Sequence, residues 1–210
     1  MQKKFFEQAM TGPEYDTTPY DEYAQELSSN WKKTARANKT TAFIGDSFFD
    51  KRYFWTDFYN VYAGKDALCM GIGSTTTFDW EKFIANGFFE EISPKNIILH
   101  LGTNNIYDDL KGAETSEDIE CLLSMLHEKL PSANIYYFAI SLRAYDEEKI
   151  ALTKLVNERV CSWCKDNGIH FLNDTVRLTP DRLRDGVHPK ADAYEVFINA
   201  IKTSVKIENL

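Results

Sequence analysis

The sequence is poor in cysteine and lacks any long apolar run. Its 4 cysteines are too few for a small secreted scaffold held together by disulfides. No run of about 18 apolar residues is present, so no segment is predicted to span a membrane. Residues 1–20 never develop the apolar core of a secretory signal. We therefore expect a cytoplasmic protein, and the sequence leaves open whether a leader has been removed.

Positive charge is scarce as well. The chain has 24 Lys and Arg against 32 Asp and Glu, which gives a formal net charge of -8. A chain of this charge without a basic stripe opposes binding to a polyanion. We therefore expect a small-molecule partner and no nucleic acid, and the oligomeric state is not predicted.

Two of the cysteines have a spacing that occurs in redox and zinc sites. Cys161 and Cys164 form the motif CSWC, but the motif falls inside a helical pattern and no second pair completes it. Cys69 and Cys121 stand apart from it. We expect ordinary thiols at these positions, and neither a metal ion nor an organic cofactor is predicted.

The length of 210 residues and the hydrophobic content of 43% fit one sizeable α/β domain. Residues 1–38 are predicted to form a helical extension packed on a domain that covers residues 39–210. In that domain apolar runs alternate with amphipathic segments. Strands are expected at 40–45, 66–70, 96–101, 134–140 and 169–172, and helices at 21–37, 50–63, 78–92, 116–130, 147–167 and 190–205.

Short strands that are apolar on both faces, each followed by a helix, predict a parallel sheet with helices on both sides. The expected fold class is therefore α/β, a three-layer α/β/α sandwich around a five-stranded parallel sheet. In such sheets ligands bind beyond the carboxyl ends of the strands. The loops that follow the strands are where functional residues are expected.

Residues suited to acyl transfer stand in these loops. Ser47 follows the first strand in the motif GDSF, and the small-residue turn GIGSTTT at 71–77 follows the second. Asn104 follows the third strand in GTNN, and Asp185 and His188 precede the last helix in DGVH. Acyl transfer needs a nucleophile, a base, an acceptor that orients the base, and donors for the oxyanion. Each of these parts has a candidate.

Ser47, His188 and Asp185 are the candidates for a catalytic triad. A serine hydroxyl is unreactive alone, so His188 would have to accept its proton. Asp185 lies three residues earlier, a spacing that lets its carboxylate reach the other ring nitrogen and fix the tautomer. Pro189 is expected to open the last helix.

The oxyanion donors are predicted from the same loops. The backbone N–H of Ser47 is one candidate, the turn with Gly73 and Ser74 offers a second, and the side-chain amide of Asn104 offers a third. Removing one such donor typically costs about 100-fold to 1,000-fold in rate. Asn104 is therefore expected to matter nearly as much as the triad.

Together, GDSF, GIGSTTT, GTNN and DGVH resemble, in this order, the four sequence blocks of the SGNH hydrolases, also called the GDSL esterase and lipase family. The resemblance spans residues 40–200. It implies a flavodoxin-like fold, Ser47 as nucleophile, His188 as base with Asp185, and an oxyanion hole from Ser47, the second block and Asn104. It also implies esters of short acyl groups, such as acetylated carbohydrates, lysophospholipids or thioesters, with no choice among them.

The second block departs from the family pattern. The family often has two adjacent glycines there, whereas this chain has Gly73 and Ser74. The N–H of Ser74 can still donate, although its Cβ restricts the turn. Which of the two residues donates stays open at this point. The first block also has Phe48 where the family name implies leucine, and the third has Asn105 where aspartate is commoner.

Alternative interpretations accompany these assignments. Ser47 could be the cap of a following helix, and residues 71–77 could cradle a phosphate, although the lysine of a P-loop is missing. The alternative function is a non-catalytic flavodoxin-like module that binds an anionic small molecule at the turn from Gly71 to Thr77. Such a module would not depend on Ser47.

Three further features receive structural or minor roles. His100, in the middle of an apolar strand, is interpreted as a hydrogen-bonded core residue, while His127 and His170 show no ligand spacing. Arg143, after the fourth strand, could contact substrate. An aromatic cluster near Ser47 is expected to be core, with a substrate wall as the alternative; it comprises Phe48, Phe49, Tyr53, Phe54, Trp55, Phe58, Tyr59 and Tyr62.

Overall fold

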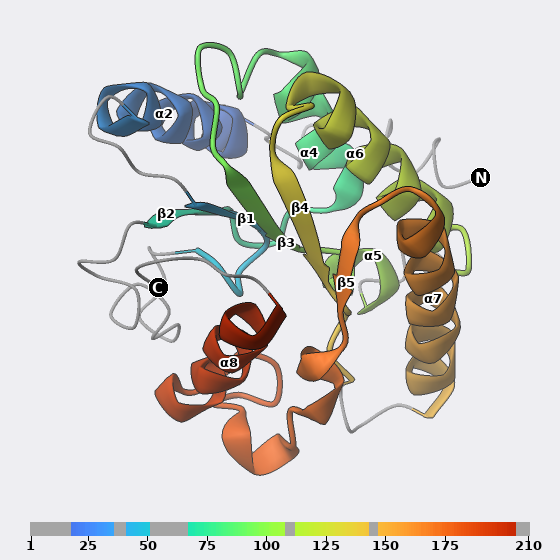
Figure 1. The fold of residues 1–210 in the computed structure, drawn as a ribbon. Coiled ribbons are helices and arrows are strands. Elements are labelled where there is room, and N and C mark those ends of the chain that lie inside the picture. Colours follow the sequence, from blue (N-terminus) through green and yellow to red (C-terminus); the bar gives the residue numbers. More distant parts are fainter. Residues whose placement is uncertain (1–17, 36–40, 51–66, 108–111, 143–146, 205–210) are drawn as a thin grey trace.

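A five-stranded parallel sheet forms the centre of the molecule (Figure 1). The computed structural model describes residues 18–35, 41–50, 67–107, 112–142 and 147–204. The strand order is β2-β1-β3-β4-β5, which confirms the predicted sheet. The strands are β1 (Thr41–Gly45), β2 (Ala67–Gly71), β3 (Asn96–His100), β4 (Asn134–Phe138) and β5 (His170–Leu172).

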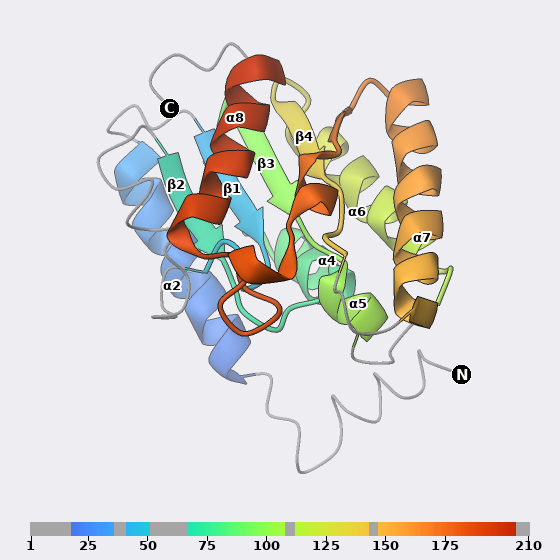
Figure 2. The ribbon, with the colours of Figure 1, turned by 90° about the horizontal axis from the view of Figure 1, so that it is seen from below.

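Helices cover both faces of this sheet (Figures 1 and 2). One face packs against α2 (Thr18–Ala35), α4 (Thr77–Ala85), α6 (Thr115–Lys129) and α7 (Glu147–Asp166), and the other against α8 (Tyr194–Ser204). The three-layer α/β/α sandwich is therefore confirmed. Shorter helices lie at its edge: α5 (Thr103–Tyr107), η1 (Asp174–Arg177), η2 (Pro180–Arg182) and η3 (Ala191–Ala193).

Side chains along each strand alternate between two hydrophobic cores. In β3, Ile97 and Leu99 join the core beneath α4 and α6, while Ile98 joins the core beneath α8. In β1, Ile44 and Phe43 divide in the same way. A strand has a side-chain period of two, so a sheet with both faces covered needs apolar residues at nearly every position. This explains the continuous apolar runs of the sequence.

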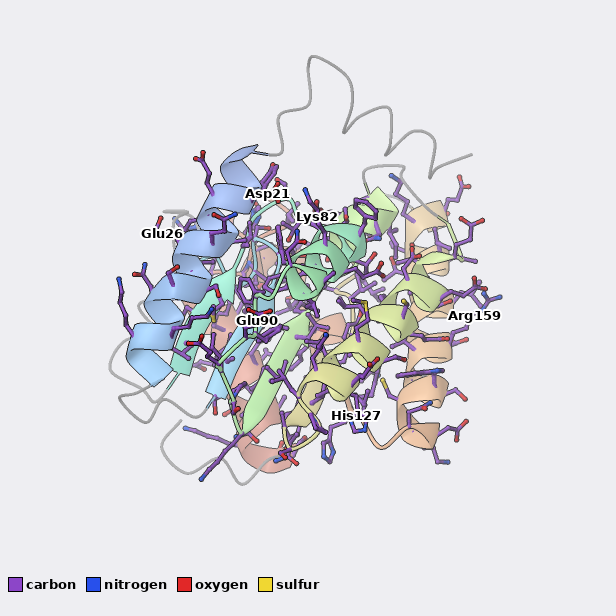
Figure 3. The ribbon with its side chains drawn as sticks, turned by 90° about the horizontal axis from the view of Figure 1, so that it is seen from above. Asp21, Glu26, Lys82, Glu90, His127 and Arg159 are labelled. Carbon is purple, nitrogen blue, oxygen red and sulfur yellow. The ribbon has the colours of Figure 1, made fainter. Side chains whose placement is uncertain are left out.

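Helix α2 packs beside α4. Nζ of Lys82 on α4 lies 2.9 Å from Oδ2 of Asp21 on α2 (Figure 3). The Ser28 hydroxyl donates to the carbonyl oxygen of Phe88 at 2.8 Å. These contacts tie α2 to the end of α4 that is remote from the carboxyl ends of the strands. The division into an extension at 1–38 and a domain at 39–210 stays a prediction.

Helix boundaries differ from the prediction where glycine and proline intervene. The helix predicted over 78–92 ends at Ala85, because Gly87 adopts a φ of 83° that stops a helix. The last helix begins at Tyr194 and not near residue 190. The helix predicted over 50–63 lies outside the described residues except for Asp50. Within the described part of the chain, every helix is too short or too polar to traverse a bilayer.

Candidate active site

The predicted site residues gather at the carboxyl ends of the strands. Ser47 follows β1, Ser74 follows β2, and Asn104 lies in α5 directly after β3. The segment between β5 and α8 passes along the same edge (Figure 2). It includes Asp185 and His188, and His188 contacts Ser47. Loops that are far apart in the sequence therefore contribute to one site.

Two glycines allow close backbone packing beneath the site. Gly45 ends β1 with a φ of 141°, and a Cβ there would lie 1.9 Å from the carbonyl oxygen of His100. A Cβ on Gly71, the last residue of β2, would lie 2.3 Å from the backbone carbonyl carbon of Phe49. Neither position has room for a side chain. The turn that holds Ser47 therefore sits directly against the neighbouring strands.

Ser47 occupies a turn that is closed by its neighbours. The buried carboxylate of Asp46 accepts the backbone N–H of Phe48 at 3.1 Å, and the Asp46 carbonyl accepts the N–H of Phe49 at 3.1 Å. The turn is therefore capped by Asp46. Among the described residues, the hydroxyl of Ser47 is bonded to His188 and caps no helix.

A continuous chain of hydrogen-bond contacts joins Ser47, His188 and Asp185. Oγ of Ser47 lies 2.9 Å from Nε2 of His188, and Nδ1 of His188 lies 2.6 Å from Oδ2 of Asp185. An imidazole that donates from Nδ1 to a carboxylate presents the lone pair of Nε2 to the hydroxyl. This geometry can accept the proton of Ser47.

The Asp185 and His188 pair sits on a short hairpin. Leu183 and Pro189 form an antiparallel bridge, and the N–H of Arg184 donates to the carbonyl of His188 at 2.8 Å. The expectation that Pro189 opens the last helix is therefore wrong. Proline lacks an N–H, but the bridge needs none from it, because the flanking N–H groups of Arg184 and Lys190 donate to the carbonyls of His188 and Arg182. The short helix η3 begins two residues later.

The Asp185 carboxylate is held in its ionised form. Partial burial raises the pKa of this group, but hydrogen bonds from the backbone and ring of His188 and from the N–H of Val187 outweigh that effect and lower the pKa below its ordinary value. The two backbone bonds measure 2.8 Å and 3.0 Å. Asp185 therefore stays charged at neutral pH, as a group that orients an imidazole must.

Nearly all backbone N–H groups of the turn over residues 71–77 donate hydrogen bonds within the protein. Of the N–H groups in this turn, only that of Ser74 has no hydrogen-bond partner among the described residues. The other N–H groups of the turn donate in chain order to Phe49 O, Gly45 O, Asp50 Oδ2, Ile72 O, Asp79 Oδ2 and Asn105 Oδ1. The turn therefore offers one donor to a ligand.

Ser74 is also the unusual residue of this turn. Its φ of 64° lies in the left-handed region, which residues with a Cβ rarely adopt, and it is exposed whereas Gly73 is buried. The N–H of Gly73 is already bonded to Oδ2 of Asp50 at 2.7 Å. Of the two candidate donors left open by the sequence, only Ser74 has a free N–H.

Asn104 and Asn105 join α5 to this turn. Nδ2 of Asn104 donates to the carbonyl of Thr75 at 2.8 Å, which leaves its second N–H for a ligand. Asn105 bonds Thr77 twice, because its Oδ1 accepts the Thr77 N–H and its Nδ2 donates to the Thr77 hydroxyl. The second and third sequence blocks are therefore fixed to each other beside Ser47.

A family comparison agrees with this geometry. The model of the GDSL-like lipase/acylhydrolase family matches residues 43–196. The chain belongs to this family. The match begins within β1 and ends within α8, so the family domain includes every residue of the site, and the resemblance drawn from the four sequence blocks is confirmed.

Curated relatives match part of the chain. The human platelet-activating factor acetylhydrolase IB subunit alpha2 is 30% identical over 93 residues, which are 44% of this chain and 40% of that protein. The Drosophila melanogaster homolog of the beta subunit of the same acetylhydrolase is 26% identical over 108 residues, 51% of this chain and 47% of that protein. The chain therefore spans less than half the length of these relatives.

Solved structures share the fold of this GDSL-like domain. A GDSL-like lipase from Bacteroides thetaiotaomicron superimposes with a TM-score of 0.61 at 19% identity, covering 87% of this chain and 97% of that one. A catalytic mutant of an acetylxylan esterase from Geobacillus stearothermophilus gives 0.61 at 16% identity, with coverages of 80% and 94%. At these identities the likeness concerns the fold alone.

The other residues singled out from the sequence are either buried in the core or lie outside the described ranges. Arg143 and the aromatic residues from Tyr53 to Tyr62 lie outside the described ranges. Phe48 and Phe49 are core residues, as predicted. His100 is buried, but the expectation that it is hydrogen-bonded is wrong, since neither ring nitrogen has a partner among the described residues. Its ring stacks on Phe48 with a centroid separation of 4.1 Å.

The four cysteines form no disulfide bonds. Cys164 is buried in α7, and burial raises the pKa of its thiol to about 12, so it stays protonated at neutral pH and is a poor nucleophile or metal ligand. Within the described ranges no three His, Cys, Asp or Glu side chains are placed to hold a metal ion.

Three residues that hold the turns of the site in place were not predicted from the sequence. Trp80 of α4 donates from Nε1 to the carbonyl of Gly45 and to the hydroxyl of Thr75, both at 3.1 Å. Asp50 and Asn105 fix the turn after β2, as described above. The motif GTNN contains Asn105. The partners of Asp50 and Trp80 are known only from the fold, because Gly73 and Gly45 lie more than 20 residues away from them in the sequence.

Proposed function

We propose that this protein is a serine esterase that hydrolyses carboxylic esters of small acyl groups through an acyl-enzyme on Ser47. The observation that carries the proposal is the 2.9 Å contact between Ser47 Oγ and His188 Nε2, two residues that are 141 positions apart. Family membership supports the same chemistry. The mechanism below follows from the geometry of the site.

In the first step Oγ of Ser47 attacks the ester carbonyl carbon while Nε2 of His188 accepts the hydroxyl proton. Asp185 stabilises the imidazolium that forms, because its carboxylate accepts the hydrogen bond from Nδ1. The tetrahedral intermediate then collapses. The bond to the leaving oxygen breaks, and the imidazolium returns its proton to the departing alcohol.

In the second step water attacks the acyl carbon of the Ser47 ester. His188 accepts a proton from this water and later returns it to Oγ, so the carboxylic acid leaves and the serine is regenerated. Each turnover consumes one ester and one water and produces one alcohol and one acid. No other reactant is needed for this balance.

The oxyanion of each intermediate is proposed to accept hydrogen bonds from the N–H of Ser47, the N–H of Ser74 and Nδ2 of Asn104. Among the described residues, the N–H groups of Ser47 and Ser74 have no other acceptor. Gly73 is not assigned this role, because its N–H is committed to Asp50. Fixed donors stabilise developing charge without reorganisation.

An acetyl ester is the substrate class that the comparisons favour. The human relative is an acetylhydrolase of platelet-activating factor and the Geobacillus neighbour is an acetylxylan esterase, so both act on acetyl groups, although on different alcohols. A short acyl group is therefore proposed for this protein, and the alcohol is left unassigned.

The geometry disfavours the alternative of an anion-binding module at the turn from Gly71 to Thr77. That turn has a single free N–H, and the carboxylates of Asp50 and Asp79 already occupy two of its donors. An anion cradle needs several free N–H groups and no competing carboxylate.

Hydrolysis of p-nitrophenyl esters tests the proposal. Wild-type protein is expected to hydrolyse the acetate faster than the octanoate, and Ser47→Ala is expected to lose nearly all activity. Ser124→Ala is the matched control, since Ser124 lies on α6 and bonds only to the carbonyl of Glu120. Activity of Ser47→Ala equal to that of Ser124→Ala would contradict the proposed esterase and favour the binding module.

A further inference from the structure

Asp50 is a buried carboxylate that the proposed reaction does not use. It lies three residues after Ser47, and its side chain is 0% exposed. Oδ2 of Asp50 accepts the N–H of Gly73 at 2.7 Å. This bond joins the turn that carries the nucleophile to the turn that follows β2. A carboxylate acceptor makes the bond stronger than one between neutral groups.

Ser74, the next residue after Gly73, has a backbone that needs such support. Its φ of 64° is unfavourable for a residue with a Cβ, and such a conformation persists only where surrounding contacts fix it. Contacts fix it on both sides. Gly73 is bonded to Asp50, and the carbonyl of Thr75 accepts from Nδ2 of Asn104 at 2.8 Å.

We propose that Asp50 is a positioning residue that holds Gly73 so that Ser74 keeps its left-handed conformation and directs its N–H to the oxyanion. This inference rests on the proposed function, in which Ser74 supplies an oxyanion donor. Asp50 itself touches neither substrate nor reacting atoms. Its bond acts on the transition state through the direction of one backbone N–H.

The inference makes Asp50 and the side chain of Ser74 energetically dependent on each other. Without the bond to Asp50, the turn can relax so that Ser74 takes a negative φ, which serine prefers. The N–H of Ser74 then no longer points to the oxyanion. Glycine at position 74 removes the conformational strain that drives this relaxation, since glycine adopts positive φ at little cost. Ser74→Gly should therefore reduce the harm done by removing Asp50.

A double-mutant cycle with p-nitrophenyl acetate tests this dependence. In the wild-type background Asp50→Ala is expected to lower kcat by about 10-fold to 100-fold, within the range for loss of an oxyanion donor, with KM changed less than about threefold. Asp50→Asn keeps an oxygen that can accept the Gly73 N–H and is expected to recover most of kcat. In the Ser74→Gly background, the loss from Asp50→Ala is expected to fall about fivefold.

Each outcome of the cycle has a defined meaning. A kcat for Asp50→Ala within twofold of wild type, or an equal loss in both backgrounds, would overturn the inference. Loss of activity in Ser47→Ala is measured in parallel, so failure of the esterase proposal is distinguished from failure of this one. Where circular dichroism shows that Asp50→Ala does not fold, the loss of kcat in Asp50→Asn is compared between the two backgrounds, and an equal loss in both would overturn the inference.

Discussion

Two pairs of neighbouring aspartate and histidine side chains lie in the described part of the chain, one at the surface and one in the core. In the first pair, Nδ1 of His188 lies 2.6 Å from Asp185, and the side chains are 15% and 46% exposed. In the second, Nδ1 of His100 lies 3.6 Å from Oδ1 of Asp46, and the side chains are 0% and 1% exposed. The same two residue types therefore occur once in a partly exposed environment and once in a fully buried one.

The two pairs differ in what surrounds the imidazole. Nε2 of His188 faces the hydroxyl of Ser47 at 2.9 Å. The ring of His100 instead stacks on Phe48, and its Nε2 has no partner among the described residues. A general base needs both an acceptor that orients it and a proton to abstract. The comparison teaches that the two imidazoles differ at both nitrogens: His188 is hydrogen-bonded to a carboxylate and to a hydroxyl, whereas neither nitrogen of His100 has a hydrogen-bond partner among the described residues.

Removing each imidazole in turn is the strongest test of this comparison. His188→Ala is expected to lower kcat by about 10,000-fold, because the Ser47 proton loses its acceptor. His100→Leu is expected to change kcat less than about threefold and to cost about 1–3 kcal/mol of stability through lost ring stacking and imperfect packing. Ester hydrolysis and urea unfolding measure the two effects.

His127→Ala is a suitable control for this pair of variants. His127 lies in the last turn of α6, away from the site (Figure 3), and its loss should leave kcat unchanged. A loss of activity in His100→Leu comparable to that in His188→Ala would break the distinction between the two pairs. A loss of stability well above about 3 kcal/mol would show that the buried carboxylate of Asp46 depends on its contact with His100.

A second test concerns Asn104, a proposed oxyanion donor that lies near the Asp185 and His188 pair and has no counterpart at the Asp46 and His100 pair. Asn104→Ala is expected to lower kcat by about 100-fold to 1,000-fold with little change in KM, because one oxyanion donor is lost. The control is Asn199→Ala, on the exposed side of α8. A rise in KM at constant kcat would instead indicate that Asn104 binds the ground state.

The smallest expected effect is the contribution of Asp185 to acid stability. The folded pKa of Asp185 lies below its ordinary value, so its stabilising contribution is present above about pH 4 and is lost as the pH falls through the folded pKa. Asp185→Asn is therefore expected to be less stable than wild type at pH 7, and the difference should shrink as the pH falls below about 4. Urea unfolding at several pH values measures this difference, and a difference that grows on acidification would contradict the assignment.

The sequence predicted the sheet and the site for a common physical reason. Strands buried on both faces require continuous apolar runs, so β1 and β3 are recognisable without any knowledge of their neighbours. The parallel arrangement then assigns every following loop to one edge. Ser47, Asn104 and His188 could therefore be placed together from one-dimensional information.

Other features depend on contacts that a linear sequence does not contain. Pro189 was expected to start a helix, but its bridge to Leu183 is a tertiary contact. The sequence did not show whether the N–H of Gly73 or that of Ser74 is unbonded, because this depends on Asp50, whose bond to Gly73 spans 23 residues. His100 was expected to find a hydrogen-bond partner, whereas the aromatic rings around it supply none. In each case a neighbour in space decided the outcome.

Labelling with a fluorophosphonate tests the central claim most directly, because the reagent reacts with a serine that a base has activated. Trypsin would release residues 40–51, and Ser47 is the single serine in that peptide. The account predicts a phosphonate adduct on this peptide in the wild-type protein and almost none in His188→Ala. Absence of the adduct from wild type, or equal labelling of both proteins, would contradict an activated nucleophile at Ser47.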